Sequence, residues 1–229
     1  MRPIVITGPT TVGKSDVSIE VARRLNGEII NSDWMYVYGF LKIGSGLSDC
    51  LRTSDISRHL YGICSATESL SVQQYLKKVK DLIPQILARG KLPIIEGCSS
   101  LYNPTLIKTN SQFLPIAIYA PQEIDLRQRV EIRLARMFTE GLLTECLELY
   151  RQGLKGIHPI QISAVYQPLM KYLDKEITLA AAKEEIVTRW MSFANWQEKR
   201  FRQISELIWI EHDSTRLSKT VDQIVELAR

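Results

Sequence analysis

The sequence predicts an α/β protein, in which a parallel sheet carries helices on both faces and a helical layer covers one end. Up to about residue 120, short apolar runs rich in β-branched residues alternate with helical segments, as in a parallel sheet. After that point helical periodicity dominates until a final apolar run. We expect a single domain over residues 1–229, with an α/β core at 1–120, a mostly helical part at 121–205, and a returning strand and helix at 206–229.

Each element is predicted from its local pattern. Strands are expected at the apolar runs 2–7, 28–32, 92–96, 114–119 and 206–211. Helices are expected where apolar residues recur every three or four positions, at 14–25, 72–88, 122–152, 160–173, 179–203 and 217–227. Gly141 lies inside the longest of these patterns. Residues 38–67 are rich in glycine, so we expect loops there that contribute to a binding site.

Composition narrows the functional classes. The 229 residues are 45% hydrophobic and 24% charged, as in ordinary globular proteins, and no apolar run is long enough to cross a membrane. The N-terminal run is too short for a signal peptide, so we expect a cytoplasmic protein. Four scattered cysteines, Cys50, Cys64, Cys98 and Cys146, indicate neither a disulfide framework nor a zinc site. The net charge of +4 suits anionic substrates but is weak evidence for nucleic acid.

One sequence motif indicates a chemical function. The segment from Gly8 to Ser15, GPTTVGKS, fits the pattern GxxxxGK[ST], and it lies between a predicted strand and a predicted helix. Glycines let the backbone turn its N–H groups toward phosphate oxygens, and the helix N-terminus adds positive potential. Lys14 supplies a full charge, and the Ser15 hydroxyl can ligate a phosphate-bound Mg²⁺. The sequence therefore predicts a P-loop NTPase-like sheet that binds a diphosphate or triphosphate.

A P-loop indicates a polyphosphate ligand but not a reaction, so a small-molecule kinase is the first alternative. The strand at 92–96 ends in Glu96-Gly97 and not in the aspartate usual near such a loop. No arginine-rich lid is evident, although four arginines, at positions 127, 129, 133 and 136, could be mistaken for one. These observations disfavour a kinase but do not exclude it.

Asp33 is the candidate general base. It follows the second predicted strand, and ligands of parallel α/β sheets bind at the carboxyl ends of the strands. A carboxylate there can accept a proton from an amine while the P-loop holds a leaving group. The alternative is that Asp33 merely caps a turn or a helix.

Several segments resemble the isopentenyl (dimethylallyl) transferase family. The GPTTVGKS motif, residues 27–33, the helix with Arg129 and Arg133, and residues 166–179 resemble tRNA dimethylallyltransferases. Residues 43–46, 96–99 and 194–201 are more similar to the adenylate isopentenyltransferases that make cytokinins. These similarities run in order from residue 3 to about residue 201.

The resemblance implies transfer of a dimethylallyl group from dimethylallyl diphosphate to an amine. Asp33 would be the base, Thr10 would contact the bridging oxygen, and Arg133 would neutralise the departing diphosphate. The diphosphate, with Mg²⁺ at Ser15, would be held by Gly8, Thr11, Gly13, Lys14, Ser15 and Arg129.

The same resemblance yields an expectation about the acceptor. The tRNA enzymes of the family carry a helical insert before the arginine-bearing helix, and only 28 positions separate Leu101 from Arg129 here. We therefore expect a small acceptor, first AMP with a cytokinin-type product, and no tRNA partner. The oligomeric state is left open, with a monomer favoured.

Departures from the family keep the acceptor open. Trp34, Tyr36, Ser45 and Gly46 are the expected acceptor-binding residues, and Trp190 and Phe193 the expected prenyl pocket. The aromatic rings could stack on a planar acceptor or belong to the core. Ala164 replaces an aspartate that contacts adenine in the adenylate enzymes, and Cys98 replaces a glycine. An indole- or guanidine-type acceptor, tRNA and a kinase reaction stay as alternatives. The apolar Phe193 predicts a preference for dimethylallyl over its hydroxylated relative.

Overall fold

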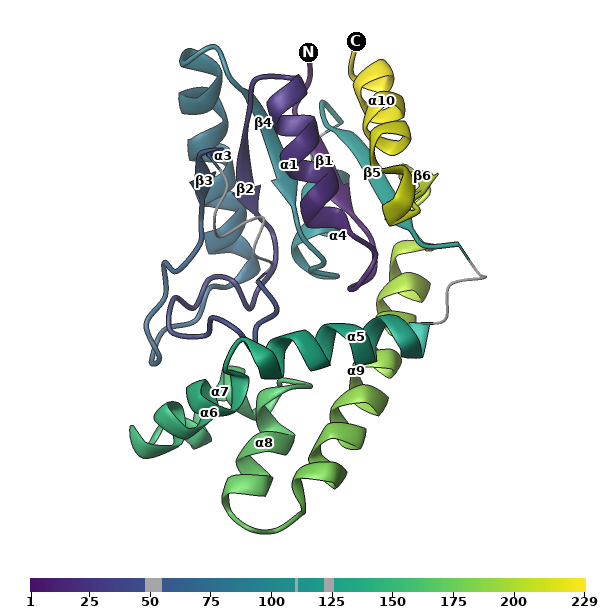
Figure 1. The fold of residues 1–229 in the computed structure, drawn as a ribbon. Coiled ribbons are helices and arrows are strands. Elements are labelled where there is room, and N and C mark those ends of the chain that lie inside the picture. The colour runs from purple at the N-terminus through teal and green to yellow at the C-terminus, as the bar shows by residue number, and fades with distance from the viewer. Residues whose placement is uncertain (48–54, 110, 122–125) are drawn as a thin grey trace.

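The computed structural model describes residues 1–47, 55–109, 111–121 and 126–229. Its centre is a six-stranded parallel sheet with the strand order β3-β2-β4-β1-β5-β6 (Figure 1). The strands are β1 Ile4–Thr7, β2 Gly27–Asn31, β3 Arg58–His59, β4 Leu92–Glu96, β5 Leu114–Tyr119 and β6 Ile208–Glu211. The five strands predicted from apolar runs are present, and the two-residue β3 was not predicted.

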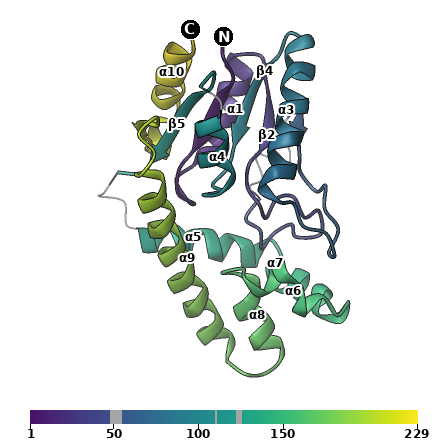
Figure 2. The same ribbon diagram turned by 180° about the vertical axis from the view of Figure 1, so that it is seen from behind.

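Two pairs of helices cover the sheet faces. Helices α1 (Lys14–Arg24) and α10 (Leu217–Ala228) lie on one face, while α3 (Val72–Ala88) and α4 (Tyr102–Thr109) lie on the other (Figures 1 and 2). Successive residues of β1 serve opposite faces: Ile4 and Ile6 belong to one buried cluster, and Val5 belongs to the other. A strand covered on both sides must be apolar throughout, which explains why the strands read as continuous apolar runs.

A helical layer lies beyond the carboxyl ends of the strands. It consists of α5 Leu126–Thr139, α6 Leu142–Arg151, the 3₁₀ turn η1 Leu154–Gly156, α7 His158–Gln161, α8 Tyr166–Leu173 and α9 Leu179–Phe201. Figure 1 shows α5 lying across this end of the sheet, with α6, α7 and α8 farther away. A second 3₁₀ turn, η2 Ser214–Arg216, precedes α10. The expected mixed α/β architecture is therefore confirmed.

The structure divides two of the expected helices. The segment predicted as 122–152 forms α5 and α6, because Gly141 adopts a left-handed φ of 102° and caps α6; residues 122–125 lie outside the described residues. The segment predicted as 160–173 forms α7 and α8, and the Ser163 hydroxyl accepts hydrogen bonds from the first amides of α8. Helix α4 was missed, since its eight residues show little amphipathic pattern.

Within the described ranges, no helix is both long and apolar enough to cross a membrane. Cys64, Cys98 and Cys146 are free thiols, and Cys50 lies outside the described residues. The described residues also contain no cluster of three or more His, Cys, Asp or Glu side chains that could hold a metal ion.

Candidate functional site

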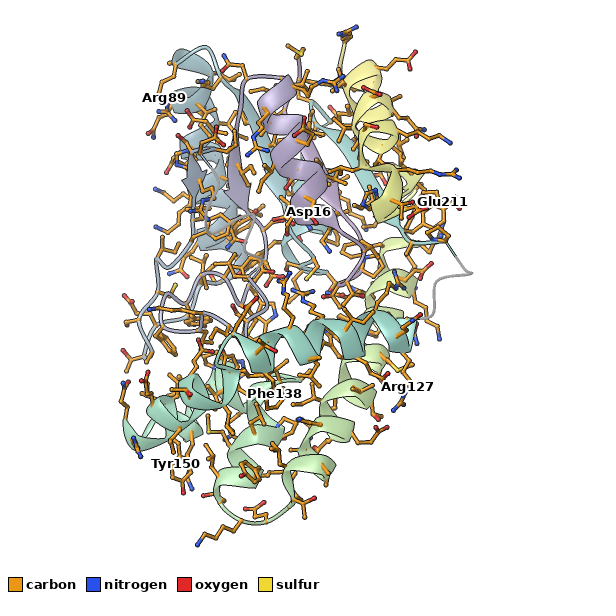
Figure 3. All side chains as sticks on the ribbon, in the orientation of Figure 1. Asp16, Arg89, Arg127, Phe138, Tyr150 and Glu211 are labelled. Carbon is orange, nitrogen blue, oxygen red and sulfur yellow. The ribbon has the colours of Figure 1, made fainter. Side chains whose placement is uncertain are left out.

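A cavity of about 1420 Å³ opens between the carboxyl ends of the strands and the helical layer. Figure 3 marks this region by Asp16, which lies at the end of α1 that faces α5. Thirteen of the predicted site residues line the cavity: Thr10, Thr11, Gly13, Lys14, Ser15, Asp33, Trp34, Tyr36, Ser45, Arg129, Arg133, Trp190 and Phe193. Gly8 and Gly46, the other two predicted residues, do not line it.

The P-loop is shaped by close contacts at its glycines. Gly8 has a φ of 133°, and a Cβ there would lie 2.2 Å from the carbonyl oxygen of Ile118. Gly13 has a φ of 85°, and a Cβ there would lie 2.7 Å from Nε2 of His212. Gly13 also caps α1 without a side-chain hydrogen bond, so a ligand can bind the free amides of the first turn. The loop thus has the shape of an anion-binding site.

Two polar side chains of the loop already have protein partners. The buried Lys14 donates a hydrogen bond from Nζ to the Pro9 carbonyl at 2.7 Å. The Ser15 hydroxyl donates to Oε1 of Glu96 at 3.4 Å. Glu96 ends β4, the strand next to β1, and its side chain is 1% exposed. Burial raises the pKa of Glu96 to about 7, Lys14 opposes this shift, and Asp33 adds to it.

Asp33 lies just beyond β2 in a turn that its own backbone helps to fix. Its N–H donates to Asn31 Oδ1 at 2.7 Å, and Asn31 Nδ2 donates to its carbonyl at 2.9 Å. The Asp33 carboxylate accepts from the Met35 N–H at 2.9 Å and from the Cys98 thiol at 2.7 Å. Asp33 is 7% exposed and faces the cavity. Burial and the Asp33 charge both raise the pKa of Cys98, which keeps the thiol a donor.

Cys98 and Gly97 together determine how β4 ends. A Cβ on Gly97 would lie 2.3 Å from the Ser32 carbonyl carbon, so only glycine lets the two strand ends approach this closely. The side chain of Cys98 lies directly on the candidate base.

Arg133 of α5 connects three walls of the cavity. Its Nη1 donates to Thr10 Oγ1 at 3.3 Å, and its Nη2 donates to the Gly46 carbonyl. Its guanidinium lies 5.0 Å from the centre of the Trp190 ring on α9. The predicted pair of Thr10 and Arg133 is therefore brought together at the P-loop.

The loop at residues 42–46 is held by a side chain that sequence reasoning missed. Glu145 of α6 accepts hydrogen bonds from the N–H groups of Lys42, Ile43 and Gly44 at 3.1, 2.8 and 2.9 Å, and from the Tyr166 hydroxyl at 2.7 Å. Four donors on one carboxylate define the loop conformation. No short motif could have found Glu145, because it lies about a hundred positions from the amides that it binds.

The residues predicted to bind the acceptor make different kinds of contact. The Tyr36 hydroxyl donates to the Gly46 carbonyl at 3.0 Å, so Tyr36, which lines the cavity, is held by Gly46, which does not. The Ser45 hydroxyl donates to the Lys42 carbonyl of its own loop at 2.7 Å. Trp34 is half-buried and meets Tyr38 edge-on, at 6.4 Å between ring centres. Burial raises the pKa of Tyr36 well above its usual range, so its hydroxyl is neutral.

The prenyl-side residues lie on α9. Trp190 is buried under Arg133, while Phe193 stacks on Trp196 at 5.9 Å between ring centres. Gln197 of the same helix was given no role from the sequence. Its Oε1 accepts from the Thr10 N–H at 2.9 Å, and its Nε2 donates to the Cys98 carbonyl at 2.9 Å. A fully buried polar residue in an apolar helix stripe was the available signal for this residue.

His212 is the other unpredicted residue at the P-loop. It follows β6, is 3% exposed, and places its ring against Gly13. Its Nδ1 lies 2.9 Å from the Thr220 hydroxyl. Burial lowers the pKa of His212, against the opposing charges of Asp16 and Asp213. A neutral imidazole is therefore favoured in this position at neutral pH.

The geometry combines an anion cradle and a carboxylate in one cavity. The P-loop can hold a polyphosphate, Arg133 can stabilise charge that develops on it, and Asp33 can accept a proton from a second reactant. An aromatic and apolar wall from α9 adjoins the arginine. This arrangement suits transfer of an apolar group away from a phosphate ester.

Comparisons with known proteins agree with this arrangement. A profile of the family described as IPP transferase matches residues 36–115 and 108–204. A tRNA dimethylallyltransferase of Anoxybacillus flavithermus is 28% identical over 297 aligned positions, covering 98% of this chain and 95% of the relative. A tRNA dimethylallyltransferase of Staphylococcus aureus is 31% identical over 181 positions, covering 79% of this chain and 58% of the relative.

The fold is also found in solved structures. The crystal structure of a tRNA delta(2)-isopentenylpyrophosphate transferase from Staphylococcus epidermidis has a TM-score of 0.88 to this chain. The match covers 99% of both chains at 23% identity. The likeness extends to the helical layer as well as to the sheet.

The comparisons contradict the expectation that this chain has no tRNA partner. The relatives that it matches over nearly their whole length are tRNA enzymes by name. The alignment with the Anoxybacillus relative spans 297 positions, so at least 68 of them have no counterpart among the 229 residues here. The expectation rested on the absence of the helical insert. An insert adds surface to a fold but leaves the cavity beside it in place, so its absence does not exclude a tRNA partner.

Proposed function

Because the chain belongs to the IPP transferase family, whose reaction is dimethylallyl transfer, we propose that its acceptor is the exocyclic amine of an adenine in tRNA. The observation that carries the proposal is the placement of Asp33 and the P-loop in one cavity. The matched tRNA dimethylallyltransferases favour tRNA as the molecule that bears the adenine.

Donor binding in this proposal uses the P-loop. The diphosphate binds the amides of Thr11, Gly13 and Ser15, and Lys14 exchanges the Pro9 carbonyl for a phosphate oxygen. The allylic C–O bond then breaks, and its electron pair leaves with the diphosphate. Arg133 and Lys14 lie where this negative charge gathers, and Thr10 is fixed beside Arg133 to contact the bridging oxygen.

Acceptor attack uses the other wall. The amine nitrogen forms a bond to the allylic carbon, and its proton passes to the Asp33 carboxylate. The Met35 amide and the Cys98 thiol hold that carboxylate in place. Trp190 and Phe193 would enclose the dimethylallyl group and exclude water from the carbocation-like centre.

Mg²⁺ fits this site. The Ser15 hydroxyl is a hard oxygen donor beside the P-loop, and a buried carboxylate lies 3.4 Å from it. Ser15 and the diphosphate would hold the ion, which when bound supplies charge neutralisation on the leaving group. The requirement for Mg²⁺ and the cytoplasmic location both remain predictions.

A free adenine nucleotide, with AMP first, is the second candidate acceptor. The observation that favours it is the segment of at least 68 residues that the Anoxybacillus enzyme has and this chain lacks. Against it, Ala164 lines the cavity at the position where the resemblance places the adenine-contacting aspartate of adenylate enzymes.

The test is a competition between acceptors. Purified protein is incubated with dimethylallyl diphosphate, Mg²⁺, an unmodified tRNA transcript and AMP, and the products are identified by mass spectrometry. The proposal expects a C5H8 increment on one adenosine of the tRNA. An increment on AMP alone would support the second candidate. In a parallel incubation with ATP added, ATP hydrolysis or a phosphorylated product, with no prenylation in either incubation, would refute both.

A further inference from the structure

Glu96 occupies a position at the P-loop that the reaction described above leaves without a role. It is the last residue of β4, and β4 pairs directly with β1, which leads into the P-loop. In register, Glu96 lies opposite Ile6 of β1 and Asn31 of β2. Its side chain thus emerges between the two strand ends that carry the anion cradle and Asp33.

The two oxygens of the Glu96 carboxylate differ in their hydrogen bonding. Oε1 accepts the weak hydrogen bond from Ser15 at 3.4 Å. Oε2 is buried and has no hydrogen-bond partner among the described residues. Leaving a buried polar atom unpaired costs about 1–3 kcal/mol, and more if it is charged, so such an atom is usually satisfied by an ordered water or a bound ion.

Lys14 and Arg133, the cations nearest to this part of the cavity, make no hydrogen bond to Oε2 of Glu96. The Lys14 ammonium donates to the Pro9 carbonyl at 2.7 Å. Arg133 donates to Thr10 and to the Gly46 carbonyl. The remaining chemistry that matches a hydroxyl and a carboxylate side by side is a hard divalent cation.

We infer that Glu96 is a second protein ligand of the Mg²⁺ that accompanies the diphosphate, together with Ser15 and either directly or through a bound water. This inference rests on the proposed function for the diphosphate donor but not on the identity of the acceptor. The small number of protein ligands is usual for Mg²⁺, which takes most of its ligands from phosphate and water.

Two other roles for Glu96 predict different results. As a general base, Glu96 would affect the chemical step and leave metal affinity unchanged. As a purely structural residue, it would affect unfolding and leave metal affinity unchanged. Metal affinity of the diphosphate complex therefore separates the three roles.

The experiment measures Mn²⁺ binding by electron paramagnetic resonance, in the presence of saturating inorganic diphosphate and without acceptor. The variants are Glu96→Gln, Ser15→Ala and the matched control Glu20→Gln. Glu20 is a partly exposed carboxylate on α1 and is not among the described residues that line the cavity. Circular dichroism and thermal unfolding establish that each variant is folded.

We expect the Mn²⁺ dissociation constant to rise about tenfold or more in Glu96→Gln and in Ser15→Ala, and to stay unchanged in Glu20→Gln. A folded Glu96→Gln variant with wild-type Mn²⁺ affinity would overturn the inference. Since no acceptor is present, failure to modify tRNA leaves this result intact, whereas failure of the wild type to bind diphosphate would count against the proposed donor.

A second measurement uses the unaltered protein, in case Glu96→Gln does not fold. Mn²⁺ broadens the NMR signals of nearby amides, so the diphosphate complex should lose the amide signals of Ser15 and Gly97 first. Broadening centred on other residues would place the metal elsewhere and overturn the inference.

Discussion

The two loops that face each other across the cavity are held in opposite ways. The P-loop, residues 8–15, takes its shape from its own glycines and from the strands that it touches. The loop at 42–46 takes its shape from Glu145, Arg133, Tyr36 and Tyr166, which come from α5, α6 and α8 and from the segment after β2. The P-loop is therefore shaped mainly by its own residues, with added contacts from Gln197 and His212, whereas the opposite loop depends mainly on tertiary contacts.

This difference predicts which substitutions should affect donor binding and which should affect acceptor binding. Changes within the P-loop alter a few amides and should affect the donor alone. Changes in the helical layer should reach the acceptor side through the loop at 42–46. Arg133 contacts both loops, so it is the residue at which the two sides meet.

The largest expected effect concerns the proposed base. Asp33→Asn should lower kcat by about 10²–10⁴-fold, because an amide cannot accept the proton from the amine. The affinity for inorganic diphosphate should remain near that of the wild type, since the P-loop is untouched. Single-turnover kinetics and calorimetric titration check the two parts. Normal turnover in this variant would show that another group is the base.

The next effect tests the connection between the two loops. Arg133→Lys keeps a positive charge but cannot reach both Thr10 and Gly46, because Lys lacks the planar fork. We expect kcat to fall by roughly 10²–10³-fold, with weaker donor and acceptor binding together. If only donor affinity changed, Arg133 would belong to the P-loop side alone, and the comparison would need revision.

A smaller effect should be confined to the acceptor side. Glu145→Gln replaces two acceptor oxygens by one and puts an amide donor against backbone amides. Unsatisfied buried donors cost about 1–3 kcal/mol, so the KM for the acceptor should rise roughly tenfold. Donor affinity should not change. Glu148→Gln, at an exposed position on the same helix, is the control and should behave as the wild type.

The smallest effect on activity is expected at the opposite end of the sheet. Glu28 accepts two hydrogen bonds from Arg89, at 2.6 and 3.1 Å, and lies 2.7 Å from His59 Nε2. Arg89 is the main cause that lowers the pKa of Glu28 in the folded chain. The stabilisation should therefore be complete above the ordinary carboxyl pKa of 4.5 and be lost as the pH falls through the lower folded value.

Glu28→Gln should consequently reduce the unfolding temperature at pH 7 and leave the kinetics unchanged. The difference from the wild type should shrink as the pH is lowered below 4.5. Thermal unfolding at several pH values checks this. A stability difference that did not depend on pH would show that Glu28 stabilises the sheet by packing and not by its charge.

Much of the donor side could be predicted from the sequence because its determinants are adjacent in the chain. The apolar runs fixed the strands, and the spacing of Gly8, Gly13 and Lys14 identified the anion cradle. The resemblance to a family then indicated Asp33, Thr10 and Arg133, which the structure places around one cavity. The roles of these residues remain proposals, but their proximity is a property of the fold.

The missed residues share a physical cause. Glu145, Gln197 and His212 each act on backbone or side chains that are distant in sequence. Gln197 interrupts the apolar stripe of its helix, but only its partners across the cavity reveal what it binds. The prediction that the chain has no tRNA partner was wrong for a related reason. The number of residues between two positions does not show which surfaces the folded chain presents.

By itself the sequence determined the sheet, the helices on its faces and the phosphate-binding turn, because backbone preferences and apolar periodicity are properties of neighbouring residues. Only the tertiary structure decided how α5, α6 and α9 bring Arg133, Glu145 and Gln197 to that turn and to the loop opposite. Hydrogen bonds between distant segments form only after the layers have packed, and a linear pattern does not record them.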